Sequence, residues 1–160
     1  MQELKIEIPV IMKTEEELDD QERRLVLEAK ASTLRSYAPY SEFSVGAAAL
    51  LDDGTIVCGS NQENCAYPSG LCAERTAIFY ANSRYPDKAV KVLCIAARNS
   101  ESKFTERPVS PCGACRQVLV ETETRYQTNI KVLLYGTEGI YMVPSARDLL
   151  PVHFDSSYLE

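Results

Sequence analysis

The chain has 160 residues, of which 45% are hydrophobic and 25% are charged, a composition typical of a soluble globular protein. Its formal net charge of -6 argues against a protein that binds a nucleic acid polymer by neutralising phosphates. No apolar run approaches the roughly 20 residues that span a bilayer, and the start lacks the features of a signal peptide, so we expect a cytoplasmic protein without a membrane partner.

The length predicts one domain over residues 1–160, with its core at about 15–154. Leucine and alanine recur among charges over residues 15–38, which predicts an amphipathic helix with Thr14 as its N-cap and Glu17 three residues later. Pro39 is expected to stop this helix.

Two strands follow, at residues 43–51 and 55–58, joined by a hairpin turn at Asp53-Gly54. Small residues in the first of them indicate that a helix packs closely against it. Before the helix, the alternating residues 4–8 suggest an added edge strand.

The second half of the chain alternates helical and strand-like patterns. Helices are expected at 72–82 and 112–123, and strands at 89–97, 130–134 and, after a turn at 136–139, 140–143. Together these elements predict an α/β fold, a three-layer α/β/α sandwich with a five-stranded mixed sheet.

Six cysteines in a chain of cytosolic character are more consistent with metal ligands or buried thiols than with a disulfide framework. Three of them, with a glutamate, form the pattern Cys72-Ala73-Glu74 … Pro111-Cys112-Gly113-Ala114-Cys115. Three protein ligands leave the fourth position of a tetrahedral zinc ion to water, which is the arrangement of catalytic sites. Zinc deaminases that act on nucleobases carry such a set, with a glutamate that is not a ligand.

With these motifs, residues 25–154 resemble cytidine deaminase, specifically the short, homotetrameric type that acts on free pyrimidine nucleosides. The resemblance implies one Zn²⁺ per chain, held by Cys72, Cys112 and Cys115. It also implies that Glu74 shuttles protons during hydrolytic deamination, and that Arg75 hydrogen-bonds the sulfurs and offsets their negative charge. The implied reaction converts cytidine and deoxycytidine to uridine and deoxyuridine plus ammonia, in pyrimidine salvage.

The resemblance further implies a set of substrate contacts. Asn61 and Glu63, in the segment Asn61-Gln62-Glu63-Asn64, match residues that grip the ribose 3′-hydroxyl, and Ala73 is a further substrate-binding position. Phe43 matches an aromatic residue that packs on the pyrimidine, and Phe154 one that reaches the base from a neighbouring subunit. A homotetramer with shared active sites is therefore implied. Because a carboxylate beside the sugar repels phosphate, we expect nucleosides to be preferred over nucleotides.

Several other interpretations remain open from the residues alone. Cys65 is a candidate fourth ligand of a structural zinc site, and C-x-x-C is also compatible with a redox dithiol. Asn61 and Glu63 have ordinary loop composition, and Phe43 and Phe154 are candidates for the core. Blasticidin-type deaminases lack the N-x-E-N segment and the arginine that follows the catalytic glutamate, so the presence of both here disfavours that function. Deoxycytidylate and tRNA-editing deaminases usually have histidine as the first zinc ligand, so Cys72 disfavours them. A non-catalytic zinc module is the alternative from another class, and it would tolerate loss of Glu74. The sole histidine, His153, is expected at the surface.

Overall fold

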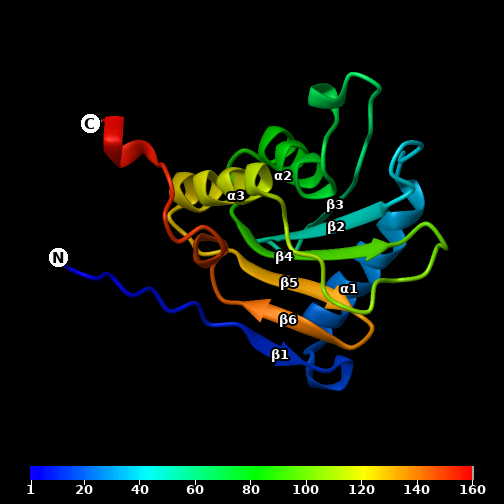
Figure 1. Cartoon of the computed structure of the whole chain (residues 1–160), viewed down its shortest axis with the longest axis horizontal. Coiled ribbons are helices and arrows are strands. Elements are labelled where there is room, and N and C mark those ends of the chain that lie inside the picture. Colours follow the sequence, from blue (N-terminus) through cyan, green and yellow to red (C-terminus); the bar gives the residue numbers. More distant parts are fainter. Residues whose placement is uncertain (160) are drawn as a thin grey trace.

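A computed structural model describes residues 1–159, which form a six-stranded mixed sheet with helices on both faces (Figure 1). The strands are β1 (Ile11–Lys13), β2 (Ser44–Leu51), β3 (Ile56–Ser60), β4 (Val90–Arg98), β5 (Lys131–Gly136) and β6 (Gly139–Val143). The α-helices are α1 (Asp20–Ser32), α2 (Ala73–Arg84) and α3 (Gly113–Tyr126). The α/β/α class expected from the sequence is confirmed.

The strand order is β1-β6-β5-β4-β2-β3, and of these neighbouring pairs only β4 and β5 run parallel. Both central strands are apolar on both faces, as expected for strands that are covered by helices on each side. One core cluster lies under α2 and α3 and includes Ile78, Leu93 and Leu119. The other lies under α1 and includes Leu25, Cys94 and Leu133, so Cys94 is a buried core thiol, as the sequence suggested.

Two glycines allow the helices to approach the hairpin of β2 and β3. A Cβ atom on Gly46 would collide with backbone atoms of α1, among them Ala29 O and, at 2.6 Å, Thr33 N. On Gly59 it would lie 2.5 Å from both Ala73 O and Ala77 N of α2. The predicted close packing of a helix on this hairpin is therefore confirmed, and it occurs on both faces.

The first helix is shorter than predicted. Residues 15–17 form only a 3-10 turn, because Asp19 adopts an extended conformation and its carboxylate accepts a hydrogen bond from Glu22 N, which starts α1 there. The helix ends at Ser32, whose hydroxyl bonds back to Glu28 O, and a further 3-10 turn follows. The expected stop at Pro39 was wrong. The predicted pairing of Thr14 with Glu17 is present, since Thr14 N donates to Glu17 Oε2 at 2.8 Å, but it caps only the 3-10 turn and not α1.

The predicted number of strands was also too small. A sixth strand forms where β1 pairs antiparallel with β6, with Ile11 opposite Met142 and Lys13 opposite Ile140. The alternating residues 4–8, which suggested an edge strand, lie outside the sheet. Pro9, which has no amide donor, separates them from β1, and β6 has only five residues to offer.

The elements of the second half match their predictions to within three residues at each end, and Gly136 to Gly139 forms the predicted tight turn between β5 and β6. Among residues 1–159, no helix combines the length and the apolar character that a bilayer span requires.

Candidate active site

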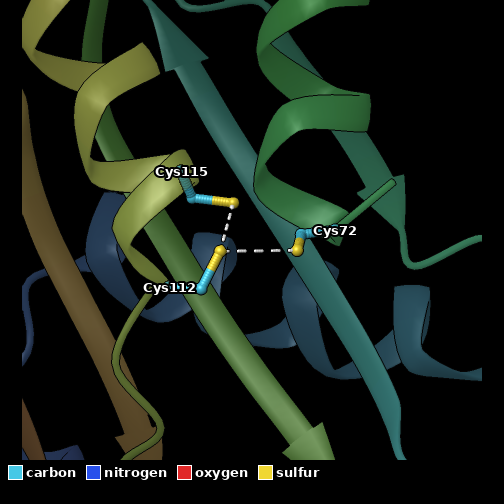
Figure 2. Close-up of side chains that lie close together, drawn as sticks. All are labelled: Cys72, Cys112 and Cys115. Atoms are coloured by element: carbon cyan, nitrogen blue, oxygen red, sulfur yellow. Dashed lines mark hydrogen bonds between the residues drawn. The ribbon is translucent and has the colours of Figure 1, made fainter. Parts of the chain in front are cut away.

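Three sulfur atoms from two helices come together at the edge of the α2 and α3 layer (Figure 2). Cys72 Sγ lies 3.7 Å from Cys112 Sγ, and Cys112 Sγ lies 3.5 Å from Cys115 Sγ. Zinc bound tetrahedrally to sulfur at about 2.3 Å separates neighbouring sulfurs by about 3.8 Å. The sulfurs therefore already have close to the spacing that one zinc ion requires, and the donor set fits that metal.

Each helix of this layer begins at a cysteine. Cys72 is the N-cap of α2 and Cys112 the N-cap of α3, while Cys115 lies in the first turn of α3. The positive end of a helix dipole stabilises thiolates, which are the form that binds metal. The two helix starts thus supply both the position and the electrostatic environment of the cluster.

Arg75 and the neighbouring thiols shift the protonation of the cluster. Hydrogen bonds from Cys115 and from Arg75, whose Nη2 lies 3.7 Å from Cys72 Sγ, lower the pKa of Cys72 to about 5. The interaction with the Cys72 thiolate, together with burial, raises the pKa of Cys115. Without a metal, Cys72 therefore ionises more readily than an ordinary thiol, and Cys115 less readily.

Glu74 follows Cys72 by two residues and lies in the first turn of α2. Its side chain is buried, and burial raises the pKa of the carboxyl group. A raised pKa makes the protonated form of the carboxyl group more accessible, which a group that both accepts and returns a proton requires.

A cavity of about 280 Å³ opens beside the sulfurs. Seven of the predicted site residues line this cavity: Phe43, Asn61, Glu63, Cys72, Ala73, Glu74 and Cys112. The other three, Arg75, Cys115 and Phe154, are not in its lining. Residues from β2, from the loop after β3 and from both helix starts thus converge on one space.

Asn61 is held by hydrogen bonds in the wall of this cavity. Its Oδ1 accepts from Val45 N at 2.8 Å and from the Ser36 hydroxyl, and its Nδ2 donates to Phe43 O at 2.8 Å. The amide group therefore fixes the start of β2, and one N–H of Nδ2 is left over to donate to another acceptor.

The Glu63 carboxylate lies on the same wall. It accepts hydrogen bonds from the Ser41 hydroxyl and from the backbone N–H groups of Tyr40, at 2.9 Å, and Ser41, at 3.3 Å. These bonds, that of the Ser41 hydroxyl first, lower the pKa of Glu63, so the group is negatively charged. An oriented carboxylate of this kind is a good acceptor for a hydroxyl group.

Phe154 does not line the cavity of its own chain. It is exposed, stacks on Tyr158 with ring centroids 5.6 Å apart, and its carbonyl accepts from Gln117 Nε2 at 2.8 Å. His153, predicted at the surface, is instead largely buried, with 14% of its side chain exposed, because it contacts Arg147 Nη1 and Leu150 O.

The sequence analysis missed several residues of the cavity wall: Ser41, Val45, Ile95, Val109 and Ser110. Ser110 could have been found from its position two residues before Cys112. The sequence around Ile95 does not mark it as a cavity residue, because an apolar residue in a buried strand is expected in the core. The predicted alternative with Cys65 as a fourth ligand is wrong for the described residues, since Cys65 is not in the sulfur cluster and contacts Asn64 instead.

The cysteine cluster, the buried glutamate and the α/β/α sandwich fit a zinc site of the deaminase class. Residues 19–129 match the family model of the cytidine and deoxycytidylate deaminase zinc-binding region. The chain belongs to this family.

Curated relatives and a solved structure agree with this assignment. A cytidine deaminase of Sporosarcina psychrophila is 44% identical over 127 residues, which cover 77% of this chain and 88% of the relative. One from Halalkalibacterium halodurans is 40% identical over 130 residues, covering 81% and 91%. The crystal structure of cytidine deaminase from Burkholderia pseudomallei has a TM-score of 0.70 and 38% identity, and covers 82% of this chain and 97% of that one.

Proposed function

We propose that this protein is a cytidine deaminase that hydrolyses free cytidine and deoxycytidine to uridine and deoxyuridine, with release of ammonia. The observation that carries the proposal is the cavity whose lining brings Glu74 together with Cys72 and Cys112 of the cysteine cluster and with Asn61 and Glu63. The family membership and the cytidine deaminases at 40% and 44% identity support the same reaction.

Cys72, Cys112 and Cys115 are the proposed ligands of one Zn²⁺ per chain. When bound, zinc lowers the pKa of a coordinated water molecule and acts as a Lewis acid. Three thiolates carry more negative charge than zinc neutralises, which opposes this effect. Arg75 offsets the excess by its hydrogen bond to Cys72 Sγ.

Glu74 is the proposed general acid and base. It takes a proton from the attacking water and delivers it to ring N3, so that the water oxygen can add to C4. It then takes the remaining hydroxyl proton and passes it to the amino group, and the bond from C4 to that nitrogen breaks. Atoms balance, because one water enters and one ammonia leaves. The raised pKa of Glu74 suits both directions of transfer.

Asn61 and Glu63 are the proposed contacts of the ribose 3′-hydroxyl, with the free N–H of Asn61 as donor and the Glu63 carboxylate as acceptor. Phe43 packs on the pyrimidine, and Ala73, at the N-terminal end of α2, contacts the base through its backbone. Because Glu63 is negatively charged and repels a nearby phosphate, cytidine is preferred over cytidine 5′-monophosphate. Comparable turnover of cytidine and of its 5′-monophosphate would contradict this specificity.

We further propose one domain with its core at residues 15–154, a cytoplasmic location, and a homotetramer in which Phe154 reaches the base in a neighbouring subunit. The exposure of Phe154 outside its own cavity is compatible with such a role. A chain that ends before Pro151 should lose most activity while its unfolding midpoint changes little. Full activity of that truncated chain would contradict the role of Phe154.

The decisive experiment follows the ultraviolet absorbance of cytidine with purified protein, with and without a chelator, while zinc per chain is counted. We expect a loss of cytidine that the chelator abolishes, and one zinc per chain. Glu74→Gln should lower kcat by about 10²-fold or more while zinc is retained. A Glu74→Gln variant with full turnover, or zinc without turnover in the parent protein, would overturn the proposal.

A further inference from the structure

Arg116, the residue directly after Cys115, joins the cysteine loop to the C-terminal segment. Its Nε donates to Pro111 O at 2.8 Å and its Nη2 to Ser110 Oγ at 3.0 Å, both just before Cys112. Its Nη1 donates to Leu149 O at 2.9 Å, at the end of a 3-10 turn near the C-terminus. One guanidinium group therefore holds two segments that lie more than 30 positions apart in the sequence.

The next residue on α3 holds the same C-terminal segment at a second point. Gln117 Nε2 donates to Phe154 O at 2.8 Å. The segment from Leu149 to Phe154 is thus tied at both ends to the first two turns of α3. The first of these turns also carries Cys115 and follows the N-cap Cys112.

We propose that Arg116 and Gln117 are positioning residues that hold the C-terminal segment of the chain in a fixed place relative to its cysteine cluster. Arg116 also fixes the Pro111 carbonyl, and with it the backbone that presents Cys112 to the metal. For the placement of Phe154 this inference rests on the function proposed above, whereas its consequence for the cysteine loop does not.

The chemistry of arginine is what makes this arrangement specific. Its planar guanidinium presents donors in a rigid fork, so three acceptors in fixed directions can be bound at once. A lysine ammonium has one nitrogen on a flexible stem and cannot bridge acceptors that are held apart in this way. Replacing Arg116 by lysine therefore keeps the charge and removes most of the geometry.

The experiment compares three variants with the parent protein: Arg116→Lys, Gln117→Ala and Arg125→Lys. Arg125 is the matched control, because it lies at the far end of the same helix, where it donates to Pro86 O at 3.5 Å and lies 5.0 Å from the centroid of the Tyr126 ring. The measurements are zinc release to a coloured chelator, hydrogen exchange of the amides of residues 149–154, and kcat and KM for cytidine.

For Arg116→Lys we expect zinc release faster by about tenfold, the usual scale for losing a residue that supports a metal ligand, and faster exchange in residues 149–154. For Gln117→Ala we expect zinc release at the parent rate, faster exchange near Phe154, and a raised KM at nearly constant kcat. Arg125→Lys should match the parent protein in every measurement.

The inference is overturned if Arg116→Lys releases zinc at the parent rate and leaves exchange in residues 149–154 unchanged, or if Arg125→Lys has the same effects as Arg116→Lys. A general loss of stability would accelerate exchange throughout the sheet and not only in residues 149–154, which would also contradict a positioning role. If the parent protein does not deaminate cytidine, the proposed function fails, while zinc release and exchange still decide the role of Arg116.

Discussion

The helices on the two faces of the sheet differ in how their N-termini are capped. On one face, α1 starts at Asp19, whose carboxylate accepts from Glu22 N at 2.7 Å, and Glu22 in turn accepts from Asp19 N. On the other face, α2 and α3 start at Cys72 and Cys112, and neither side chain makes a capping hydrogen bond. The face with the cysteine cluster thus lacks two side-chain helix caps, each worth about 1 kcal/mol, at the positions of two proposed metal ligands.

The largest expected effect on stability comes from replacing, on each face of the sheet, the glycine that contacts a helix backbone. Gly46→Ala and Gly59→Ala both push a methyl group into helix backbone, against α1 and α2 respectively, so each should destabilise the fold by about 3 kcal/mol. Only Gly59→Ala displaces Ala73, between Cys72 and Glu74. We expect it alone to lower zinc affinity by about tenfold or more, with urea unfolding and zinc titration as measurements.

Gly46→Ala is thus the matched control for Gly59→Ala. If the two variants lose zinc to the same extent at equal stability, the claim that only the α2 face affects zinc binding is wrong. The comparison would also fail if Gly59→Ala bound zinc with the affinity of the parent protein.

A smaller effect is expected at the buried carboxylate under α1. The Glu22 side chain is only 3% exposed, and it pairs with Lys131 Nζ at 2.7 Å and Lys13 Nζ at 2.9 Å. Burial acts to raise the pKa of Glu22, but the hydrogen bonds from these lysines and from Asp19 N outweigh it, so the pKa is lowered from 4.5. Glu22→Gln should cost about 2 kcal/mol at pH 7.

The pH dependence of this cost has a definite sign. Because the pKa of Glu22 is lower in the folded chain, its contribution is fully present above about pH 4.5 and is lost as the pH falls through the folded value. The difference in unfolding free energy between the parent protein and Glu22→Gln should therefore shrink as the pH falls below 4.5 and through the folded pKa of Glu22. Glu121→Gln, at an exposed position on α3, is the control. A difference that does not change with pH would contradict the charged pairing.

The part of the site that sequence could predict is the part encoded by short spacing. The C-x-E and P-C-x-x-C motifs each place their residues within one helical turn, so the sulfurs and Glu74 followed once the helices were placed. The contacts that escaped prediction join distant segments. Arg116 with Leu149 is separated by 33 positions, and no local pattern records that pairing.

The fold errors have the same origin. Thr14 and Asp19 each cap an element of their own, the 3-10 turn and α1. The apolar pattern does not reveal the break between them at Leu18, because Leu18 is itself buried. The sixth strand depends on an open edge at β6, which is a property of the assembled sheet. The alternation of residues 4–8 was real, but no described strand offers it a partner.

The cap of α1 is itself testable. Asp19→Ala removes the acceptor for Glu22 N and should lower the unfolding free energy by about 1 kcal/mol, without a change in zinc affinity. Calorimetry with a zinc titration measures both quantities. A change in zinc affinity would mean that the α1 face and the cysteine cluster are coupled, contrary to the comparison above.

The smallest expected effect is a gain in stability, at a helix start on the face with the cysteines. Cys72 already has the extended backbone of an N-cap residue, with φ -71° and ψ 155°. Serine is a preferred residue at that position, because its hydroxyl accepts from the amides of the first turn. Below about pH 5, where the Cys72 sulfur is protonated and its charged hydrogen bond with Arg75 is lost, Cys72→Ser should therefore stabilise the metal-free protein by about 0.5 kcal/mol, and the variant should also bind zinc more weakly. Unfolding in the presence of a chelator, beside the parent protein under the same conditions, measures this difference. If the metal-free Cys72→Ser variant were less stable than the parent protein under these conditions, the sulfur would contribute more stability than a serine cap. The absence of a side-chain cap at Cys72 would then carry no cost in stability.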